Sequence, residues 1–148
     1  MFGRRGGIMG SNGVFSLSEP FLCDVVLVWR RKLSGLGRHY GVALLDAFGN
    51  VISVNDLTNK NEIRLLSLDE FCEGRRAQWG HSCGRDGLAA ALERLDQARL
   101  DPQVACFHLA DWNCETFARW VVTGYGESKQ VNDAVVAGLV GLALYAFK

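Results

Sequence analysis

The 148-residue chain lacks several features that would assign it to a common functional class. Its 16 basic and 16 acidic residues cancel, so it has no net positive field of the kind that attracts nucleic acid. The glycine-rich stretch between Gly3 and Gly13 has no Gly-Lys-Ser/Thr ending, which excludes a phosphate-binding P-loop. The five cysteines are odd in number and irregularly spaced, which does not fit the disulfide framework of a small secreted protein.

Neither end of the chain shows the apolar segment of a secretory signal or one long enough to span a bilayer. Residues 1–20 contain glycines and two arginines but no apolar core of a secretory signal, so we expect a leader outside the core of an intracellular, cytoplasmic protein. Residues 134–147 are fourteen consecutive apolar or glycine residues, fewer than the roughly 20 that span a bilayer as a helix. Residues 132–148 are therefore expected to form an apolar helix that either docks on the core or lies at a membrane surface.

The apolar patterns of residues 21–131 predict one domain of the α+β class. Runs rich in β-branched residues predict strands over residues 23–29, 39–45, 51–54 and 62–66. A capping box at Ser67, a periodic apolar pattern ended by Pro102, and a third helical pattern ended by Gly124 predict helices over residues 68–72, 86–101 and 113–123. Residues 74–84 are polar and rich in glycine, and they are expected to form a loop.

The third predicted helix begins with a cysteine. Cys114 directly follows Asn113, and at a helix start the free backbone N–H groups and the helix dipole favour thiolate over thiol. The same N–H groups, including that of Cys114, can hold an oxyanion. Phe117 and Val121 share the face of Cys114, which points the sulfur inward. The alternative is that Cys114 is a small buried core residue.

A nucleophilic cysteine needs a base, and His39 is the best candidate. It begins an apolar strand and lies at the open end of the predicted hairpin. We therefore predict a thiol enzyme with Cys114 as nucleophile and His39 as base. Trp112, Asn113 and Tyr40 adjoin these two residues in sequence and are predicted to form the substrate pocket.

A zinc site is the competing interpretation. His81 and Cys83, and likewise Cys106 and His108, form two closely spaced pairs of metal-ligand types. Zinc ligand pairs usually have two or more intervening residues, whereas each pair here has one. We therefore predict no metal and no organic cofactor.

Three segments resemble the lecithin:retinol acyltransferase family. They are Asp24–Val28, His39–Val42 and Asn113–Ala118, followed by Thr123-Gly124, Ser128 and Gln130-Val131, and the resemblance covers residues 23–131. It implies a circularly permuted NlpC-type papain-like fold with a small antiparallel sheet packed against helices. It also implies that Cys114 forms an acyl thioester from a lipid-like ester, as an acyltransferase or hydrolase. Several relatives carry an apolar C-terminal segment that holds them on membranes, which suggests membrane-surface contact through residues 134–147.

The sequence departs from this family at two positions. The family usually has a second histidine on the strand after the hairpin, where this chain has Ser53 as the nearest match. Asn55 shares the strand face of Ser53 and can accept from the imidazole, as in Cys-His-Asn sites, so we predict Asn55 or Ser53 as the residue that orients His39. Thr116 is the second departure. Two alternatives stay open, an inactive binding module that engages a protein or membrane, and a peptide or amide hydrolase on the same fold.

Overall fold

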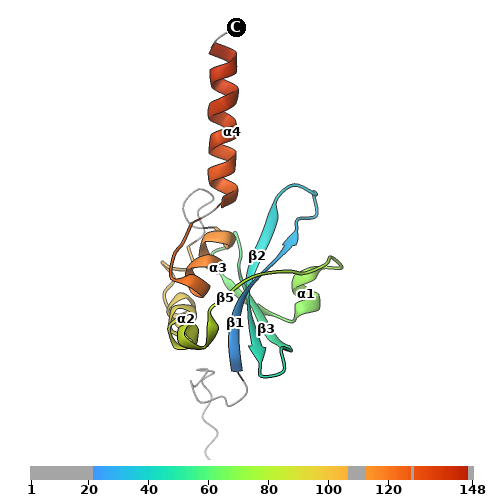
Figure 1. The fold of residues 1–148 in the computed structure, drawn as a ribbon, viewed down its shortest axis with the longest axis vertical. Coiled ribbons are helices and arrows are strands. Elements are labelled where there is room, and N and C mark those ends of the chain that lie inside the picture. Colours follow the sequence, from blue (N-terminus) through green and yellow to red (C-terminus); the bar gives the residue numbers. More distant parts are fainter. Residues whose placement is uncertain (1–21, 107–112, 128, 147–148) are drawn as a thin grey trace, which may run out of the picture.

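The computed structural model describes residues 22–106, 113–127 and 129–146 (Figure 1). The expected leader, residues 1–20, lies outside the described residues, as do Trp112 and His108. The described part is an α+β fold in which a five-stranded antiparallel sheet is followed by helices packed against it. This confirms the predicted α+β class.

The sheet has the strand order β4-β3-β2-β1-β5. Its strands are β1 (Leu22–Arg31), β2 (Arg38–Asp46), β3 (Val51–Leu57), β4 (Ile63–Leu66) and β5 (Gln78–Ser82). The four predicted strands correspond to β1 to β4, so the hairpin that begins at His39 is confirmed. Strand β3 continues to Leu57 instead of ending at Val54, because Asn55 and Asp56 are buried and pair with β4.

The loop predicted over residues 74–84 is wrong, since it contains β5. This strand pairs with β1 at the edge of the sheet, where Trp79 lies opposite Val28. Most of its residues are exposed, so the strand needs no apolar alternation and gave no strand pattern in the sequence. A side chain on Gly80 would place its Cβ only 2.6 Å from Leu27, so glycine permits the close approach of the two strands.

Helices cover both faces of the sheet (Figure 1). On one face α2 (Gly84–Leu100) and α3 (Cys114–Thr123) pack against β1 and β2. Buried apolar side chains fill this layer, among them Val25, Leu27, Val42, Leu44, Ala91, Leu95, Phe117 and Val121. On the other face the short helix α1 (Leu68–Cys72) places Phe71 against Val28, Ala43 and Val54. The predicted capping box is present, with Ser67 and Glu70 as partners.

The last helix, α4 (Lys129–Ala146), projects away from the domain (Figure 1). It is joined to the domain at its first turn, where the backbone N–H of Gln130 donates to the buried Glu115 carboxylate at 3.0 Å. Its described apolar side chains are exposed, including Val135, Leu139 and Leu142. A helix docked on the core, one of the two expectations for this segment, is therefore wrong. Among the residues that the structure describes, no helix has the length and apolar character needed to cross a membrane.

Candidate active site

Cys114 is the first residue of α3, and Asn113 caps that helix. The Asn113 side-chain oxygen accepts from the N–H groups of Glu115 at 3.0 Å and Thr116 at 3.1 Å. A cap of this kind stabilises a helix by about 1 kcal/mol. It fixes the position of Cys114, whose side chain is 6% exposed and belongs to the core cluster with Phe117 and Val121. The predicted helix start and the inward orientation of Cys114 are both confirmed.

The structure brings the thiol of Cys114 and the imidazole of His39 together. His39 lies on β2, the strand against which α3 packs most closely. The two side chains line the same cleft. They are close enough that each shifts the pKa of the other, raising that of His39 and lowering that of Cys114. Packing of one helix on one strand thus joins two residues that are far apart in the sequence.

The other partner of His39 is Asp56. The His39 Nε2 atom lies 2.6 Å from the Asp56 Oδ2 atom, and the Asp56 side chain is fully buried. Arg64 on β4 holds the same carboxylate, with its Nη2 atom 2.9 Å from Oδ2. Because Nε2 is engaged by Asp56, Nδ1 is the ring nitrogen left for the thiol. The three side chains form a Cys-His-Asp series, in which His39 is bonded to Asp56 and shares a cleft with Cys114.

The residues predicted to orient His39 are not its partners. Asn55 is buried and accepts from the Arg99 guanidinium on α2. Since consecutive residues of a strand point to opposite faces, Asn55 faces α2 whereas Asp56 faces His39. Ser53 is buried, and its hydroxyl has no hydrogen-bond partner within the described part of the chain. The prediction of Asn55 or Ser53 is corrected to Asp56.

The sequence did not predict Asp56 as the acid because the predicted strand ends at Val54, whereas β3 continues to Leu57. The pairs Val42 with Asn55 and Ala43 with Val54 give the register of β2 and β3. One further step places Asp56 opposite Gly41, two residues along β2 from His39. Two residues is one pleat repeat, so the two side chains share a face. Extending the strand by the alternation of Val54 and Asp56 would have found the acid.

The charges of the site favour a thiolate paired with an imidazolium. Burial alone would lower the pKa of His39, but its hydrogen bonds to Asp56 and Cys114 outweigh burial and raise the pKa from 6.5 to about 9. Burial alone would raise the pKa of Cys114, but the hydrogen bond and charge of His39 outweigh it and lower that pKa. The Tyr40 N–H and the charge of Lys32 act in the same direction. For Asp56, burial would raise the pKa, yet His39 and Arg64 keep it below its ordinary value.

The ring of Phe71 on α1 packs against the His39 imidazole. Phe71 stacks on His39 with 5.5 Å between ring centroids and 28° between planes. The Arg30 guanidinium lies 5.6 Å from the same phenyl centroid and donates to the Phe71 carbonyl. A Cβ on Gly41 would come within 2.9 Å of the Phe71 ring and 2.8 Å of Val54. Glycine at position 41 is therefore required for Phe71 to approach His39.

A cleft of about 420 Å³ opens onto His39 and Cys114. Four cationic side chains and one carboxylate line it, Arg30, Lys32, Lys60, Arg64 and Glu62. Arg30 is paired with Glu73 at 3.0 Å and Arg64 with Asp56 at 2.9 Å, so Lys32 and Lys60 against Glu62 leave the cleft with an excess of positive charge. The cleft therefore suits a ligand with a negatively charged group near the bond that reacts.

Two of the predicted pocket residues, Tyr40 and Asn113, do not line the cleft at Cys114. Tyr40 is in the core and borders a different hollow, beside Trp29 and Arg38. The Asn113 side-chain oxygen caps α3, and the backbone N–H of Thr116 is one of its two donors. Trp112 lies outside the described residues. The residues missed by sequence reasoning are Asp56, Arg64 and Lys32, whose spacing in the chain gave no motif.

The competing zinc site has no support in the described part of the chain. No group of three or more His, Cys, Asp or Glu side chains is placed there so that it could hold a metal ion. His81 is exposed on β5, and the Cys83 thiol donates to the Asp24 carboxylate at 3.4 Å. The second predicted pair includes His108, which lies outside the described residues.

Comparison with known proteins adds no relative to this picture. No protein-family model, curated protein or solved structure matches the chain.

Proposed function

We propose that the protein is a thiol acyltransferase or hydrolase that forms an acyl thioester on Cys114 from a lipid-like ester. The observation that carries the proposal is the placement of His39, which is bonded to the buried Asp56 carboxylate and lines one cleft together with the Cys114 thiol. We further propose that the fold is the NlpC-type permuted papain-like fold of the lecithin:retinol acyltransferase family. The order of base before nucleophile and the resemblance of residues 23–131 support this assignment.

Acylation begins with the thiolate of Cys114. It attacks the ester carbonyl carbon, forming a C–S bond and a tetrahedral oxyanion. The C–O bond then breaks, and the His39 imidazolium donates its proton to the departing alkoxide, which leaves as an alcohol. The products of this half-reaction are the acyl-Cys114 thioester and a neutral imidazole held by Asp56.

Deacylation reverses these roles. Neutral His39 takes a proton from water or from an acceptor hydroxyl, and the resulting nucleophile attacks the thioester carbonyl. The C–S bond breaks, so that a free acid or a new ester leaves and the Cys114 thiolate and His39 imidazolium are restored. Asp56 stays ionised in both half-reactions and keeps Nε2 of His39 engaged, which is an orienting role.

The start of α3 supplies donors for the oxyanion. The Asn113 side chain occupies the N–H groups of Glu115 and Thr116 and not that of Cys114. The Cys114 N–H, next to the attacking sulfur and at the positive end of the helix dipole, is therefore placed to stabilise a developing negative charge.

The cleft and α4 support a lipid-like substrate. Lys32 and Lys60 provide positive charge close to the thiol, which suits an ester with an anionic headgroup. The described part of α4 presents exposed apolar side chains in a helix that stands clear of the domain. We propose that residues 134–147 contact a membrane surface peripherally, so that the enzyme works where its substrate is concentrated.

Trapping the thioester tests the proposed chemistry. The full chain is incubated with a fluorogenic phospholipid, quenched in acid, and digested for mass spectrometry. The expected result is an acyl group on the peptide that contains Cys114, and no acyl group in the Cys114→Ser variant. The matched control is Cys83→Ser, which alters a cysteine at another helix start and should leave the adduct unchanged.

Other outcomes point to the alternatives. A protein that is folded, as judged by circular dichroism, but never acylates Cys114 with any ester would be a binding module. An adduct that forms from activated amides or peptides and not from esters would indicate that the protein is a peptide or amide hydrolase. Either result contradicts the ester chemistry proposed here.

A further inference from the structure

The hairpin between β1 and β2 ends in two exposed leucines. Leu33 is 77% exposed and Leu36 is 79% exposed. The turn that carries them is fixed by hydrogen bonds, from the N–H of Gly35 to the Lys32 carbonyl at 3.0 Å and from the N–H of Lys32 to the Gly37 carbonyl at 3.2 Å. The turn therefore presents two large apolar side chains to solvent in a defined arrangement.

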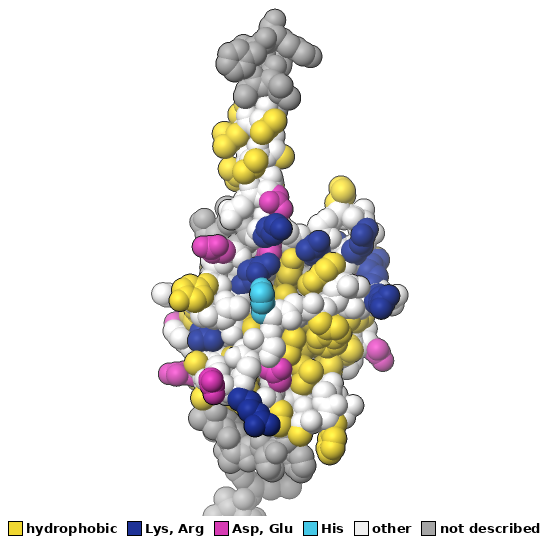
Figure 2. Space-filling view, in the orientation of Figure 1, with side chains coloured by type: hydrophobic (Ala, Val, Ile, Leu, Met, Phe, Trp, Pro, Cys, Tyr) yellow, Lys and Arg dark blue, Asp and Glu magenta, His cyan; other side chains and the backbone are white. Residues whose placement is uncertain are grey.

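Cations surround these leucines. Arg31, Lys32, Arg75 and Arg76 line the hollow that includes Leu33, and Arg38 follows the turn with its guanidinium 4.2 Å from the centre of the Trp29 ring. Figure 2 shows Lys and Arg side chains gathered on this side of the domain, with apolar side chains between them. We call Leu33, Leu36 and these five cations the hairpin surface.

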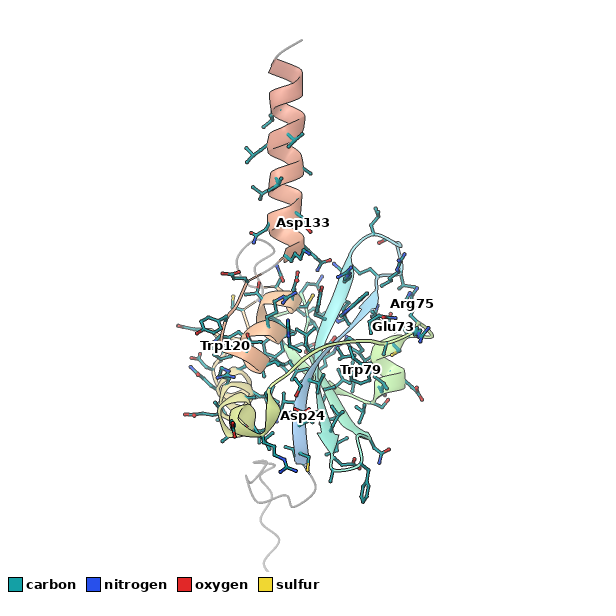
Figure 3. The ribbon with its side chains drawn as sticks, in the orientation of Figure 1. Asp24, Glu73, Arg75, Trp79, Trp120 and Asp133 are labelled. Atoms are coloured by element: carbon teal, nitrogen blue, oxygen red, sulfur yellow. The ribbon has the colours of Figure 1, made fainter. Side chains whose placement is uncertain are left out.

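Few carboxylates balance the hairpin surface. Glu73 lies nearby, on the same side of the domain as Arg75 (Figure 3), but it is paired with Arg30 at 3.0 Å and lies 4.0 Å from Arg75. Asp133, at the base of α4, borders the neighbouring hollow with Arg31 and Arg38. Five cations against these two carboxylates leave a positive surface with an apolar tip.

We propose that the hairpin surface binds a membrane that contains anionic lipid. Apolar side chains that enter the boundary between headgroups and acyl chains, ringed by Lys and Arg at headgroup level, are the two components of reversible membrane binding. Each Lys or Arg near an anionic surface adds attraction that decays within a Debye length. The charge complementarity favours a bilayer over an apolar protein groove, which would leave the cations without partners.

The position of the hairpin surface relates it to the cleft. Lys32 lines both the cleft that contains Cys114 and the hollow beside Leu33. The first turn of α4 lies on the same side, since the N–H of Arg38 donates to the Gln130 side-chain oxygen at 2.7 Å. A membrane held by the hairpin surface would therefore face the mouth of the cleft and the base of α4. In this respect the inference deepens the proposed function and rests on it, whereas membrane binding itself does not require the thiol chemistry.

The hairpin between β2 and β3 offers a matched control. It also carries an exposed large apolar side chain, Phe48 at 87%. Its turn is organised by the carboxylate of Asp46, which accepts from the N–H groups of Phe48 at 2.8 Å and Asn50 at 2.9 Å. An apolar tip next to a carboxylate should not be attracted to an anionic surface.

Vesicle partitioning of the full chain tests the inference. Partition coefficients are measured by co-sedimentation with phosphatidylcholine vesicles that contain or lack phosphatidylserine, and their ratio reports the charge-dependent part of binding. The double variant Leu33→Ser/Leu36→Ser should lower partitioning onto the mixed vesicles about tenfold or more. The variant Arg31→Glu/Arg76→Glu should bring the ratio close to one, and Phe48→Ser should change neither quantity.

A second measurement separates the hairpin surface from α4. Hydrogen exchange with mixed vesicles should slow at the amides of residues 32–37 and stay unchanged at residues 46–50. Equal ratios in wild type and in the charge-reversed variant, with no slowing at residues 32–37, would overturn the inference and leave membrane contact to α4. Concentration-dependent dimers that the leucine variant abolishes, without selective binding to anionic vesicles, would assign the surface to a second copy of the chain and would also overturn it.

Failure of this inference and failure of the proposed chemistry are distinguishable. Cys114→Ser should partition onto vesicles like the wild type, because the thiol is no part of the hairpin surface. A leucine variant that loses binding to vesicles should still form the acyl-Cys114 adduct with a short-chain, water-soluble ester.

Discussion

Cys83 and Cys114 both stand at the start of a helix, yet their surroundings are opposite. Cys83 is the residue that precedes α2, and its thiol lies 3.4 Å from the Asp24 carboxylate. Burial and Asp24 raise its pKa. Cys114 begins α3 beside His39, and its pKa is lowered. A helix start therefore does not make a thiol reactive by itself.

The magnitudes explain why the neighbours decide. A helix dipole stabilises a charge at its terminus by about 0.3–1 kcal/mol at an exposed site and by up to about 2 kcal/mol at a partly buried one. Because one pKa unit corresponds to roughly 1.4 kcal/mol, the dipole shifts a pKa by at most about 1.5 units. An opposite charge within hydrogen-bonding distance shifts a pKa by about 1–3 units. His39 therefore contributes more to the thiolate of Cys114 than the start of α3 does. At Cys83, burial and then Asp24 raise the pKa despite the helix start.

Removing the base should erase most of the difference between the two cysteines. In His39→Ala the thiolate of Cys114 loses its counter-charge and the leaving alcohol loses its proton donor, so kcat/KM for an ester should fall about 10²- to 10⁴-fold. Alkylation of Cys114 at pH 6 should fall toward the rate for Cys83. A variant that retains fast alkylation of Cys114 would show that the helix start suffices.

Removing the acid should have a smaller effect on the same pair. In Asp56→Asn the imidazolium loses the carboxylate that raises its pKa, so the pKa of His39, followed by NMR titration of its ring protons, should fall from about 9. The kcat/KM should drop about 10²-fold, at the lower end of the range for general acid–base catalysis, because His39 itself remains in place. Asn55→Ala is the matched control on the adjacent residue, and it should leave the pKa of His39 unchanged because Asn55 contacts Arg99 instead. An equal shift in both variants would contradict the assignment of Asp56.

The pH dependence of activity should show a plateau through neutral pH. Activity needs the thiolate of Cys114, which is lost as pH falls below its lowered pKa, and the imidazolium of His39, which is lost as pH rises through about 9. Profiles of kcat/KM against pH should therefore bend downward near pH 9 and again on the acidic side. A profile that rises steadily to high pH would indicate a neutral thiol activated only by general base.

Changing the partner of Cys83 should have the smallest effect. Burial, the largest cause of the raised pKa of Cys83, remains in Asp24→Asn, so the alkylation rate of Cys83 at pH 7 should rise by less than about tenfold. Mass spectrometry of alkylated peptides measures the rate for each cysteine in one sample. A rise that brings Cys83 level with Cys114 would mean that the carboxylate alone separates the two sites.

The sequence predicted the elements whose signals are local. The capping box at Ser67 and the glycine after Thr123 are short motifs that depend on neighbouring residues, and each forms as expected. The inward orientation of the Cys114 side chain follows from helical periodicity, which is also a local signal. These features need no knowledge of how distant segments pack.

The features that the sequence did not predict depend on strand pairing. Strand β5 exists because β1 offers an edge, and its own residues carry no strand pattern. The partner of His39 depends on how far β3 continues past Val54. Asn55 and Asp56 are neighbours on this strand and point to opposite faces, so a shift of one residue would bring Asn55 to the face of His39 in place of Asp56. The third member of the site is therefore decided by register, which no local motif encodes here.

The most direct test of the central claim is the alkylation rate of each cysteine in the wild-type protein at pH 6. Iodoacetamide reacts with thiolate, so the rate for each cysteine reports the ionised fraction and the access of its thiol. We expect Cys114 to be modified at least about tenfold faster than Cys83 and the exposed Cys23. Equal rates at these three cysteines would contradict a thiolate held by His39 and, with it, the proposed enzyme.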